Sequence, residues 1–274
     1  MINTVKGFLR GTWVYYVYRF FVAKGLMHRP ANVVREFVRL PFIFDRVSFV
    51  MQMRQLARVK EIAAEKPADD LGKTEHFKKV FDHNATTTST KQVLTNRLSE
   101  RAYAVIALPV RELRDEKLLS IGSRTVHELL IAWTQGFSWK NITGVDLYST
   151  HQKILPMNME NLSIEDEQYD CVVMANVLSY ASDTKQALSE ALRVLKPGGR
   201  FVFNGTYDPQ ATDLWPESYH SGKDLHKMLH DLGAEIYFWH SRDIANSLGN
   251  VETDHLIGCV KPPKGATKAD PFYL

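Results

Sequence analysis

The stretch "KLLSIGSRTVHEL", Lys117 to Leu129, decides the fold class of this 274-residue chain. It begins with a short apolar run, which is typical of a buried strand. A single glycine, Gly122, then leads into a pattern with helical spacing. A strand, a turn and a helix in this order form the ligand-binding loop of nucleotide-binding α/β domains. Such loops usually carry two or three glycines, so the stretch indicates a working ligand site, a modified one or a relic.

The segments that follow alternate between strand-like and helix-like patterns. Apolar runs predict strands at 142–147, 169–178, 200–207, 235–241 and 255–262, and helical spacing predicts helices at 126–135, 183–195 and 221–234. Asp183 is a candidate N-cap, and "KPGG" at 196–199 predicts a turn. The alternation predicts an α/β fold with a mostly parallel sheet covered on both faces. Ligands of such sheets bind beyond the carboxyl ends of the strands.

The beginning of the chain has a different character. Residues 1–60 contain eleven Lys/Arg and two Asp/Glu, whereas the rest of the chain contains 23 and 29. Apolar and aromatic positions in residues 1–65 recur at mixed three- and four-residue spacing, which is typical of helices. We therefore expect a helical, basic extension over residues 1–100 and a ligand-binding domain over 101–274. Within the extension, "HNATTTSTKQ" at 83–92 predicts a polar turn, either a mobile loop over a site or a linker.

The basic segment favours an anionic partner. Charged residues, among them Arg10 and Arg19, interrupt its apolar part too often for a membrane span of about 20 apolar residues. No small-residue cleavage site follows it. We expect residues 1–60 to pack as helices on their own protein or on a second subunit of a homodimer. The alternative is peripheral contact with the inner face of the membrane, and in both cases we expect a cytoplasmic protein.

The remaining composition narrows the partners. The two cysteines, Cys171 and Cys259, fall in predicted strands and form neither a disulfide framework nor a metal cluster, which fits a reducing compartment. The ten histidines show no convincing metal-ligand spacing. The net acidic body carries no known nucleic-acid module. We therefore expect neither a metal nor a nucleic acid as partner.

Four stretches between residues 117 and 261 resemble the class I, Rossmann-like methyltransferases that use S-adenosylmethionine (SAM), in particular those of methyltransferase type 11. They are "LLSIGSRTV", "ITGVDLYS", "MNMENLSIEDEQYDCVVMANVLSY" and "ALSEALRVLKPGGRFVF". The last two, in that order and spacing, are fairly specific, whereas the first alone is weak. The resemblance covers about half of the chain. It implies a doubly wound, mostly parallel seven-stranded sheet, SAM as cofactor and methyl transfer as activity.

The resemblance also implies cofactor-binding residues. Asp146, at the end of the second strand, would accept hydrogen bonds from both ribose hydroxyls, although a solvated acid at a strand end is the alternative. Asn158 would pair with the adenine amino group, and Met159 would lie against the adenine ring. The further cofactor-binding candidates are Gly122, Ser123, Arg124, Glu128, Leu147 and Asn176.

The glycine-poor loop departs from the family pattern G-x-G-x-G, because Arg124 and Val126 replace the two later glycines. Val126 cannot adopt a positive φ cheaply, so the loop must differ or the helix must begin earlier. We expect Arg124 to pair with the carboxylate of the cofactor's methionine tail and Glu128 to bind its ammonium group. The alternatives are an exposed ion pair between these two residues and an Arg124 side chain that blocks the pocket.

Methyl transfer from a sulfonium is a direct displacement that depends on aligning the acceptor with the methyl group. A hydroxyl acceptor usually needs a base, and the candidates after the fourth and fifth strands are His220, Tyr207 and Asp208, together with Tyr180 and His226. His220 is the first of these, with an ordinary surface histidine as the alternative.

The acceptor is barely encoded in the sequence. We expect a small molecule, with a hydroxyl of a sugar or polysaccharide as the preferred group. Two other classes of protein remain: a non-catalytic, methyltransferase-like binding or scaffold protein, and a nicotinamide-dependent oxidoreductase. The oxidoreductase is disfavoured because the loop lacks the later glycines, which in that class let the backbone approach the pyrophosphate of the cofactor.

Overall fold

The computed structural model describes residues 34–35, 37–40, 43–44, 46–47, 50, 75–90, 98–109, 112–207, 221–245, 251–263 and 265. The chain divides into two compact units, Met1–Val47 and Ser48–Leu274. The described residues of the first unit are mainly helical, with Val38 and Phe44 buried. The expected boundary between an extension and a ligand-binding domain near residue 100 stays a prediction.

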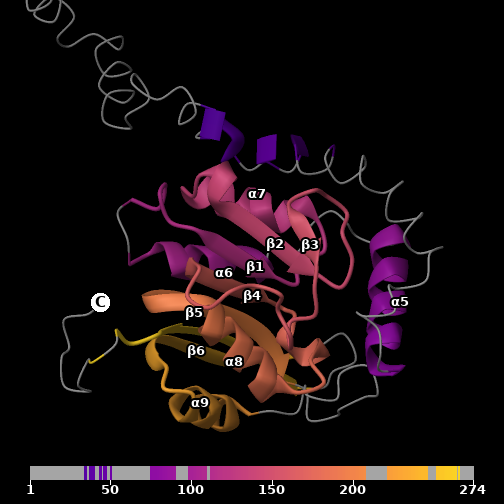
Figure 1. Cartoon of the computed structure of the whole chain (residues 1–274). Coiled ribbons are helices and arrows are strands. Elements are labelled where there is room, and N and C mark those ends of the chain that lie inside the picture. The colour runs from indigo at the N-terminus through magenta and orange to yellow at the C-terminus, as the bar shows by residue number, and fades with distance from the viewer. Residues whose placement is uncertain are drawn as a thin grey trace, which may run out of the picture. The chain divides into compact units, whose positions relative to one another are not determined.

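One sheet forms the centre of the second unit. Its strands are β1 (Leu118–Ile121), β2 (Ile142–Asp146), β3 (Ile154–Pro156), β4 (Tyr169–Ala175), β5 (Leu195–Tyr207), β6 (Glu235–Ala245) and β7 (Val251–Val260). Within the described part of the chain these seven strands have the order β3-β2-β1-β4-β5-β7-β6 (Figure 1). β1 to β5 pair in parallel, whereas β7 pairs antiparallel with both β5 and β6. This confirms the predicted mostly parallel, doubly wound fold.

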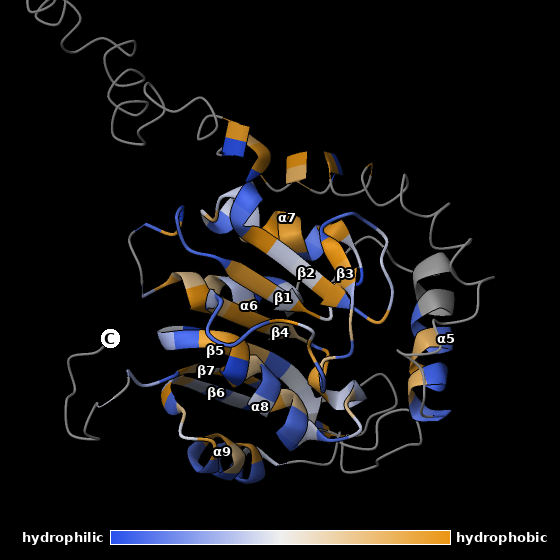
Figure 2. Ribbon diagram, viewed as in Figure 1, coloured by the Kyte–Doolittle hydropathy of each residue, from blue (hydrophilic) through white to orange (hydrophobic). Residues whose placement is uncertain are grey.

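The described helices of the second unit pack on the faces of this sheet or lie at the ends of its strands. They are α5 (Glu75–Thr90), α6 (Leu98–Ala107), α7 (Val126–Gln135), α8 (Thr184–Val194) and α9 (Gly222–Asp231), with the 3-10 turns η1 (Trp139–Asn141) and η2 (Leu178–Tyr180). On β1, Leu119 and Ile121 join the buried cluster of α8 and α9, while Ser120 turns to Tyr103 of α6. Hydrophobic residues follow β1 and β4 at the centre of the sheet (Figure 2).

Local sequence signals explain most element boundaries. Asp183 caps α8, because its carboxylate accepts a hydrogen bond from Gln186 N at 2.9 Å. Ser221 and Asp224 form a reciprocal capping box at the start of α9. Both cysteines are buried in strands, as predicted.

Two expectations about elements need correction, and one strand was not predicted. "KPGG" does not separate helix from strand: β5 runs through it with a register shift against β4, and Gly198 adopts φ 78°. Residues 83–90 of "HNATTTSTKQ" are helical and complete α5, so the polar turn predicted there is wrong. The sequence did not predict β3, which is only three residues long.

Among the described residues, no helix is long and apolar enough to cross a membrane. The same part of the chain holds no group of three or more His, Cys, Asp or Glu side chains placed to bind a metal ion. Most of residues 1–60 lie outside the described residues, so their expected packing stays a prediction.

Candidate active site

A pocket lies at the carboxyl ends of β1, β2 and β4, where the strand order reverses. This is the place at which doubly wound sheets bind ligands. The strand ends and the segments that follow them contribute most of the lining, and one face of α5 contributes the rest. The lining residues are Phe77, Val80, Asn84, Ile121, Gly122, Val145, Asp146, Leu147, Met157, Asn158, Met159, Val177 and Tyr180.

Asp146 is the acidic group of this pocket. It is the last residue of β2, it is only 8% exposed, and its Oδ1 accepts a hydrogen bond from Leu147 N at 2.7 Å. Burial raises the pKa of Asp146 to about 6, against the opposing charge of Arg124 and the hydrogen bond from Leu147. At neutral pH Asp146 is therefore mainly a buried carboxylate. A hydrogen-bond donor on a ligand would stabilise this charge.

Gly122 shapes the turn between β1 and α7. It adopts φ 79°, and a Cβ at this position would clash with the side chain of Val177. The amides of Gly122 and Ser123 both donate to Val145 O, at 2.7 and 3.1 Å. The turn is therefore fastened to the end of β2, next to Asp146.

The helix after this turn begins early enough to avoid positive φ at Val126. Thr125 is the N-cap of α7, and its hydroxyl accepts a hydrogen bond from His127 N at 3.4 Å. Val126 is then the first helical residue. The sequence allowed either a different loop or an earlier start of the helix. The structure shows the second, because α7 already begins at Val126.

The structure places Ser123 beneath the loop and away from the pocket. Its side chain is fully buried, and its Oγ donates to Ser120 O at 3.2 Å and to Ser120 Oγ. The Ser120 hydroxyl in turn lies 2.5 Å from the Tyr103 hydroxyl. This chain of hydroxyls joins the loop to α6, so the side chain of Ser123 has a structural partner.

Arg124 and Glu128 lie beside the pocket and are not part of its lining. Burial is the main cause of the lowered pKa of His83, and the charge of Arg124 lowers it further. The same charge opposes the rise that burial causes in the pKa of Asp146, so the guanidinium lies within electrostatic reach of β2 and of α5. Glu128 accepts a hydrogen bond from Thr125 Oγ1 at 3.1 Å. Their roles toward the methionine tail stay predictions.

The segment after β3 forms a second wall of the pocket. Met157 N donates to Asp146 O at 2.8 Å, which holds this wall against the end of β2. Asn158 Oδ1 accepts from Glu160 N at 2.9 Å and retains a second acceptor site. Met159 is 9% exposed and belongs to the core of the sheet. Asn158 and Met159 therefore line the same pocket as Asp146, and their roles toward adenine stay predictions.

Glu160 ties this wall to the start of α8. Its carboxylate accepts hydrogen bonds from Ser182 N at 2.5 Å, from Ser182 Oγ at 2.7 Å and from Asp183 N at 3.1 Å. The amide of Gln186 adds a hydrogen bond to Glu160 O at 3.1 Å.

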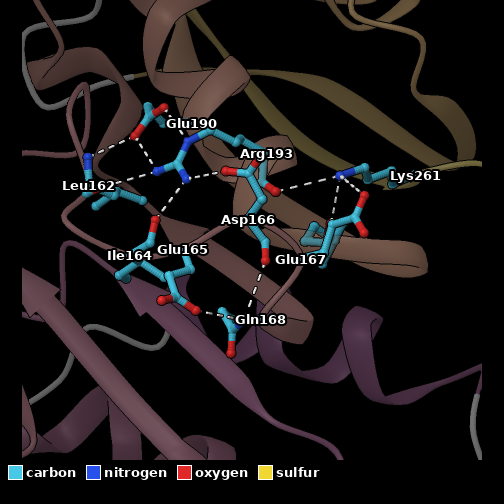
Figure 3. A network of polar contacts seen from close by, with 10 residues as sticks. Leu162, Ile164, Glu165, Asp166, Glu167, Gln168, Glu190, Arg193 and Lys261 are labelled. Atoms are coloured by element: carbon cyan, nitrogen blue, oxygen red, sulfur yellow. Dashed lines mark hydrogen bonds and ion pairs between the residues drawn. The ribbon is translucent and has the colours of Figure 1, made fainter.

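Arg193 ties the following residues to the end of α8 (Figure 3). Its guanidinium donates to Leu162 O, Ile164 O and the carboxylates of Asp166 and Glu190 at 2.7 to 2.9 Å. Glu190 also accepts from Leu162 N at 2.7 Å, and the hydrogen bonds from Arg193 lower the pKa of Glu190. The wall is the beginning of a segment, Met157 to Gln168, whose first three residues line the pocket. Hydrogen bonds join this segment to the start and to the end of α8.

Asn176 lies just after β4 and outside the pocket lining. It adopts φ 54°, its N donates to Asn204 O at 3.0 Å, and its Oδ1 accepts from Asn204 Nδ2 at 2.8 Å. The side chain therefore joins β4 to β5. Of the nine cofactor-binding candidates, the pocket brings together Gly122, Asp146, Leu147, Asn158 and Met159.

The candidate bases are only partly visible. His220 and Asp208 lie outside the described residues, and Tyr207 ends β5 with a side chain that also lies outside them. Tyr180 lines the pocket, and its carbonyl oxygen accepts a hydrogen bond from His76 Nε2 at 2.9 Å. His226 lies beside Trp239, with ring centroids 6.0 Å apart. Tyr180 is thus the candidate that the structure places at the pocket.

Helix α5 is the part of the site that the sequence did not reveal. Phe77, Val80 and Asn84 line the pocket from one helix face, with the spacing i, i+3 and i+7. Phe81 packs against Tyr148 of the loop after β2, with ring centroids 5.5 Å apart. That spacing was a readable signal, but the polar run "TTTST" at 86–90 obscured it.

Comparison with known proteins agrees with this geometry. Residues 119–203 match the model of a family described as a methyltransferase domain. A ubiquinone/menaquinone biosynthesis C-methyltransferase of Bartonella quintana is 38% identical over 82 residues, which are 28% of this chain and 31% of that protein. A sarcosine/dimethylglycine N-methyltransferase of Aphanothece halophytica is 30% identical over 97 residues, which are 35% of this chain and 33% of that protein.

A solved structure shows the same fold. It is that of a Galdieria sulphuraria protein provisionally named a sarcosine dimethylglycine methyltransferase, with a TM-score of 0.50 and 14% identity, covering 63% of this chain and 89% of that one. The second unit therefore has the Rossmann-like methyltransferase fold. Its residues 119–203 match the methyltransferase domain family, which supports the resemblance inferred from the sequence. The chain spans less than a third of the length of the Bartonella relative.

Proposed function

We propose that this chain is a SAM-dependent methyltransferase that acts on a small-molecule acceptor. The observation that carries the proposal is the buried carboxylate of Asp146 at the end of β2, in one pocket with Gly122 and Asn158. A carboxylate can accept hydrogen bonds from two donors at once, as a ribose diol provides. The match of residues 119–203 to the methyltransferase domain family supports the same cofactor and activity.

Different lining residues bind different parts of the cofactor. Asp146 accepts from the ribose hydroxyls, Asn158 pairs with the adenine amino group, and Met157 and Met159 lie against the purine ring. Gly122 lets the backbone approach the cofactor closely. SAM supplies an activated methyl group on a sulfonium, and the protein's main task is to align an acceptor with it.

For the acceptor we propose an order in which classes of small molecule should be tested. A hydroxyl of a saccharide is the first group to test, because the basic residues 1–60 favour an anionic partner. Quinol and amine acceptors come next, since the relatives are named for quinone biosynthesis and for sarcosine. A cytoplasmic location and a role of residues 1–60 in subunit or membrane-surface contact complete the proposal.

Calorimetric titration of the purified chain with SAM and with S-adenosylhomocysteine tests the cofactor. We expect micromolar binding of both, loss of binding in Asp146→Ala, and unchanged binding in Asp115→Ala, which removes an exposed carboxylate near the start of β1. NADH serves as the negative ligand. A folded wild-type chain that binds neither SAM nor its product contradicts the proposal.

Acceptor screening follows, with release of S-adenosylhomocysteine as the readout. Turnover with a member of one acceptor class establishes that class. Cofactor binding without turnover on any class would favour the alternative of a methyltransferase-like binding protein.

A further inference from the structure

We propose that Asn84 of α5 is a binding residue for the nucleoside half of the cofactor. The inference rests on the proposed function and extends it to a helix that lies outside the matched methyltransferase domain, residues 119–203. It assigns α5 a direct polar contact with the ligand, in addition to covering the pocket.

The first argument is the state of the Asn84 side chain. Asn84 is 7% exposed, and it lines the pocket together with Asp146 and Asn158. Its Oδ1 is fully buried and has no hydrogen-bond partner among the described residues. A buried carbonyl oxygen without a hydrogen-bond partner destabilises the free protein, because its hydration is lost and not replaced. A ligand that donates a hydrogen bond into the pocket removes this cost.

The second argument is where along the cofactor this group lies. The polar residues that share the pocket with Asn84 include Asp146 and Asn158, the residues expected to bind ribose and adenine. Arg124 and Glu128, the candidates for the methionine tail, are not part of the lining. Asn84 therefore accepts from a ribose hydroxyl or from the adenine amino group.

The third argument is the anchoring of α5 at the same end of the sheet. Phe81, three residues before Asn84, packs on Tyr148, two residues after Asp146. Phe77 and Val80 add apolar lining from the same face of the helix. The side of α5 that faces the pocket thus combines one carboxamide with two apolar side chains, a common composition for a small-molecule pocket.

The test compares Asn84→Leu with wild type by calorimetry, with S-adenosylhomocysteine and 5′-methylthioadenosine as probes. Leucine has the same number of side-chain heavy atoms and the same branch at Cγ, and it has no polar atom. We expect the affinity for both probes to fall three- to tenfold. Because 5′-methylthioadenosine lacks the amino-acid tail, an equal loss for both probes places the contact on the nucleoside. Asp82→Ala, an exposed change on the same helix, should leave both affinities unchanged.

A stability measurement separates a ligand contact from a structural role. Removing an unpaired buried oxygen should leave the thermal midpoint of the free Asn84→Leu protein equal to wild type or higher. Unchanged affinities would overturn the inference while leaving the proposed function intact. A loss for S-adenosylhomocysteine alone would overturn the nucleoside assignment. A wild-type chain that binds neither probe would overturn both the inference and the proposed function.

Discussion

The two walls of the pocket are built in different ways. The segment from Met157 to Gln168, whose beginning forms one wall, is fixed by hydrogen bonds: Glu160 holds the start of α8, and Arg193 holds its end. The opposite wall, α5, meets the domain through ring contacts and through the hydrogen bond from His76 to Tyr180 O. One wall is a preorganised platform, whereas the other is an amphipathic helix laid over the site.

The difference has a consequence for ligand entry. The fixed wall falls within residues 119–203, the part shared with the methyltransferase domain family, and α5 falls outside it. The free energy of local opening is lower for segments with few buried contacts than for segments packed in the core. We therefore expect α5 to move when the cofactor enters, while the platform keeps its geometry.

The largest expected effect comes from breaking the platform with Arg193→Met. Glu190, 8% exposed, would remain as a buried carboxylate without its cation, and two backbone carbonyls would lose a donor. We expect the free energy of unfolding, measured by urea denaturation, to fall by about 3–4 kcal/mol.

Lys227→Met is the matched control for this variant. It removes a cation from the exposed pair with Asp231 on α9, and surface pairs of this kind contribute little. A loss in Arg193→Met no larger than in the control would show that the platform does not depend on Arg193.

The next effect concerns the electrostatic cost of the pocket and is tested with Asp146→Asn. Burial raises the pKa of Asp146 from 3.8 to about 6, so the folded state binds a proton more tightly than the unfolded state. Wild-type stability is therefore lost as the pH rises from about 4 to 6. We expect Asp146→Asn to be more stable than wild type at pH 7.5 by roughly 2–3 kcal/mol, with the difference disappearing below about pH 4.

Urea denaturation from pH 4 to pH 7.5 measures this difference. Asp115→Asn, at an exposed position, should follow the wild-type profile at each pH. A difference between Asp146→Asn and wild type that does not change with pH would mean that the charge of Asp146 is balanced in the free protein.

The fold and the platform side of the site could be predicted from the sequence. Asp146 ends β2, Gly122 follows β1, and Asn158 lies two residues after β3. Parallel strands bring their carboxyl ends together, so the three residues meet in one pocket. The grouping of these residues thus followed from strand patterns, a parallel sheet and the resemblance to methyltransferases, and their roles toward the cofactor stay predictions.

The remaining features depend on contacts between distant segments. The side chain of Ser123 turns inward because Tyr103, 20 positions earlier in the chain, supplies a hydroxyl network through Ser120. Asn84 reaches the pocket because α5 packs across a strand end more than 60 residues away along the chain. Its polar neighbours indicated a turn, and tertiary packing outweighed that local preference.

The smallest effect sharpens the contrast between the two walls and comes from Phe81→Leu. This change keeps an apolar side chain and removes the edge-to-face contact with Tyr148, a geometry worth about 1 kcal/mol. We expect amide hydrogen exchange in α5 to accelerate about fivefold, while exchange in residues 157–162 stays at the wild-type rate. Asp82→Ala should change neither segment. Equal acceleration in both segments would show that α5 and the platform open as one unit. The contact between Phe81 and Tyr148 would then also determine the free energy of opening of the platform.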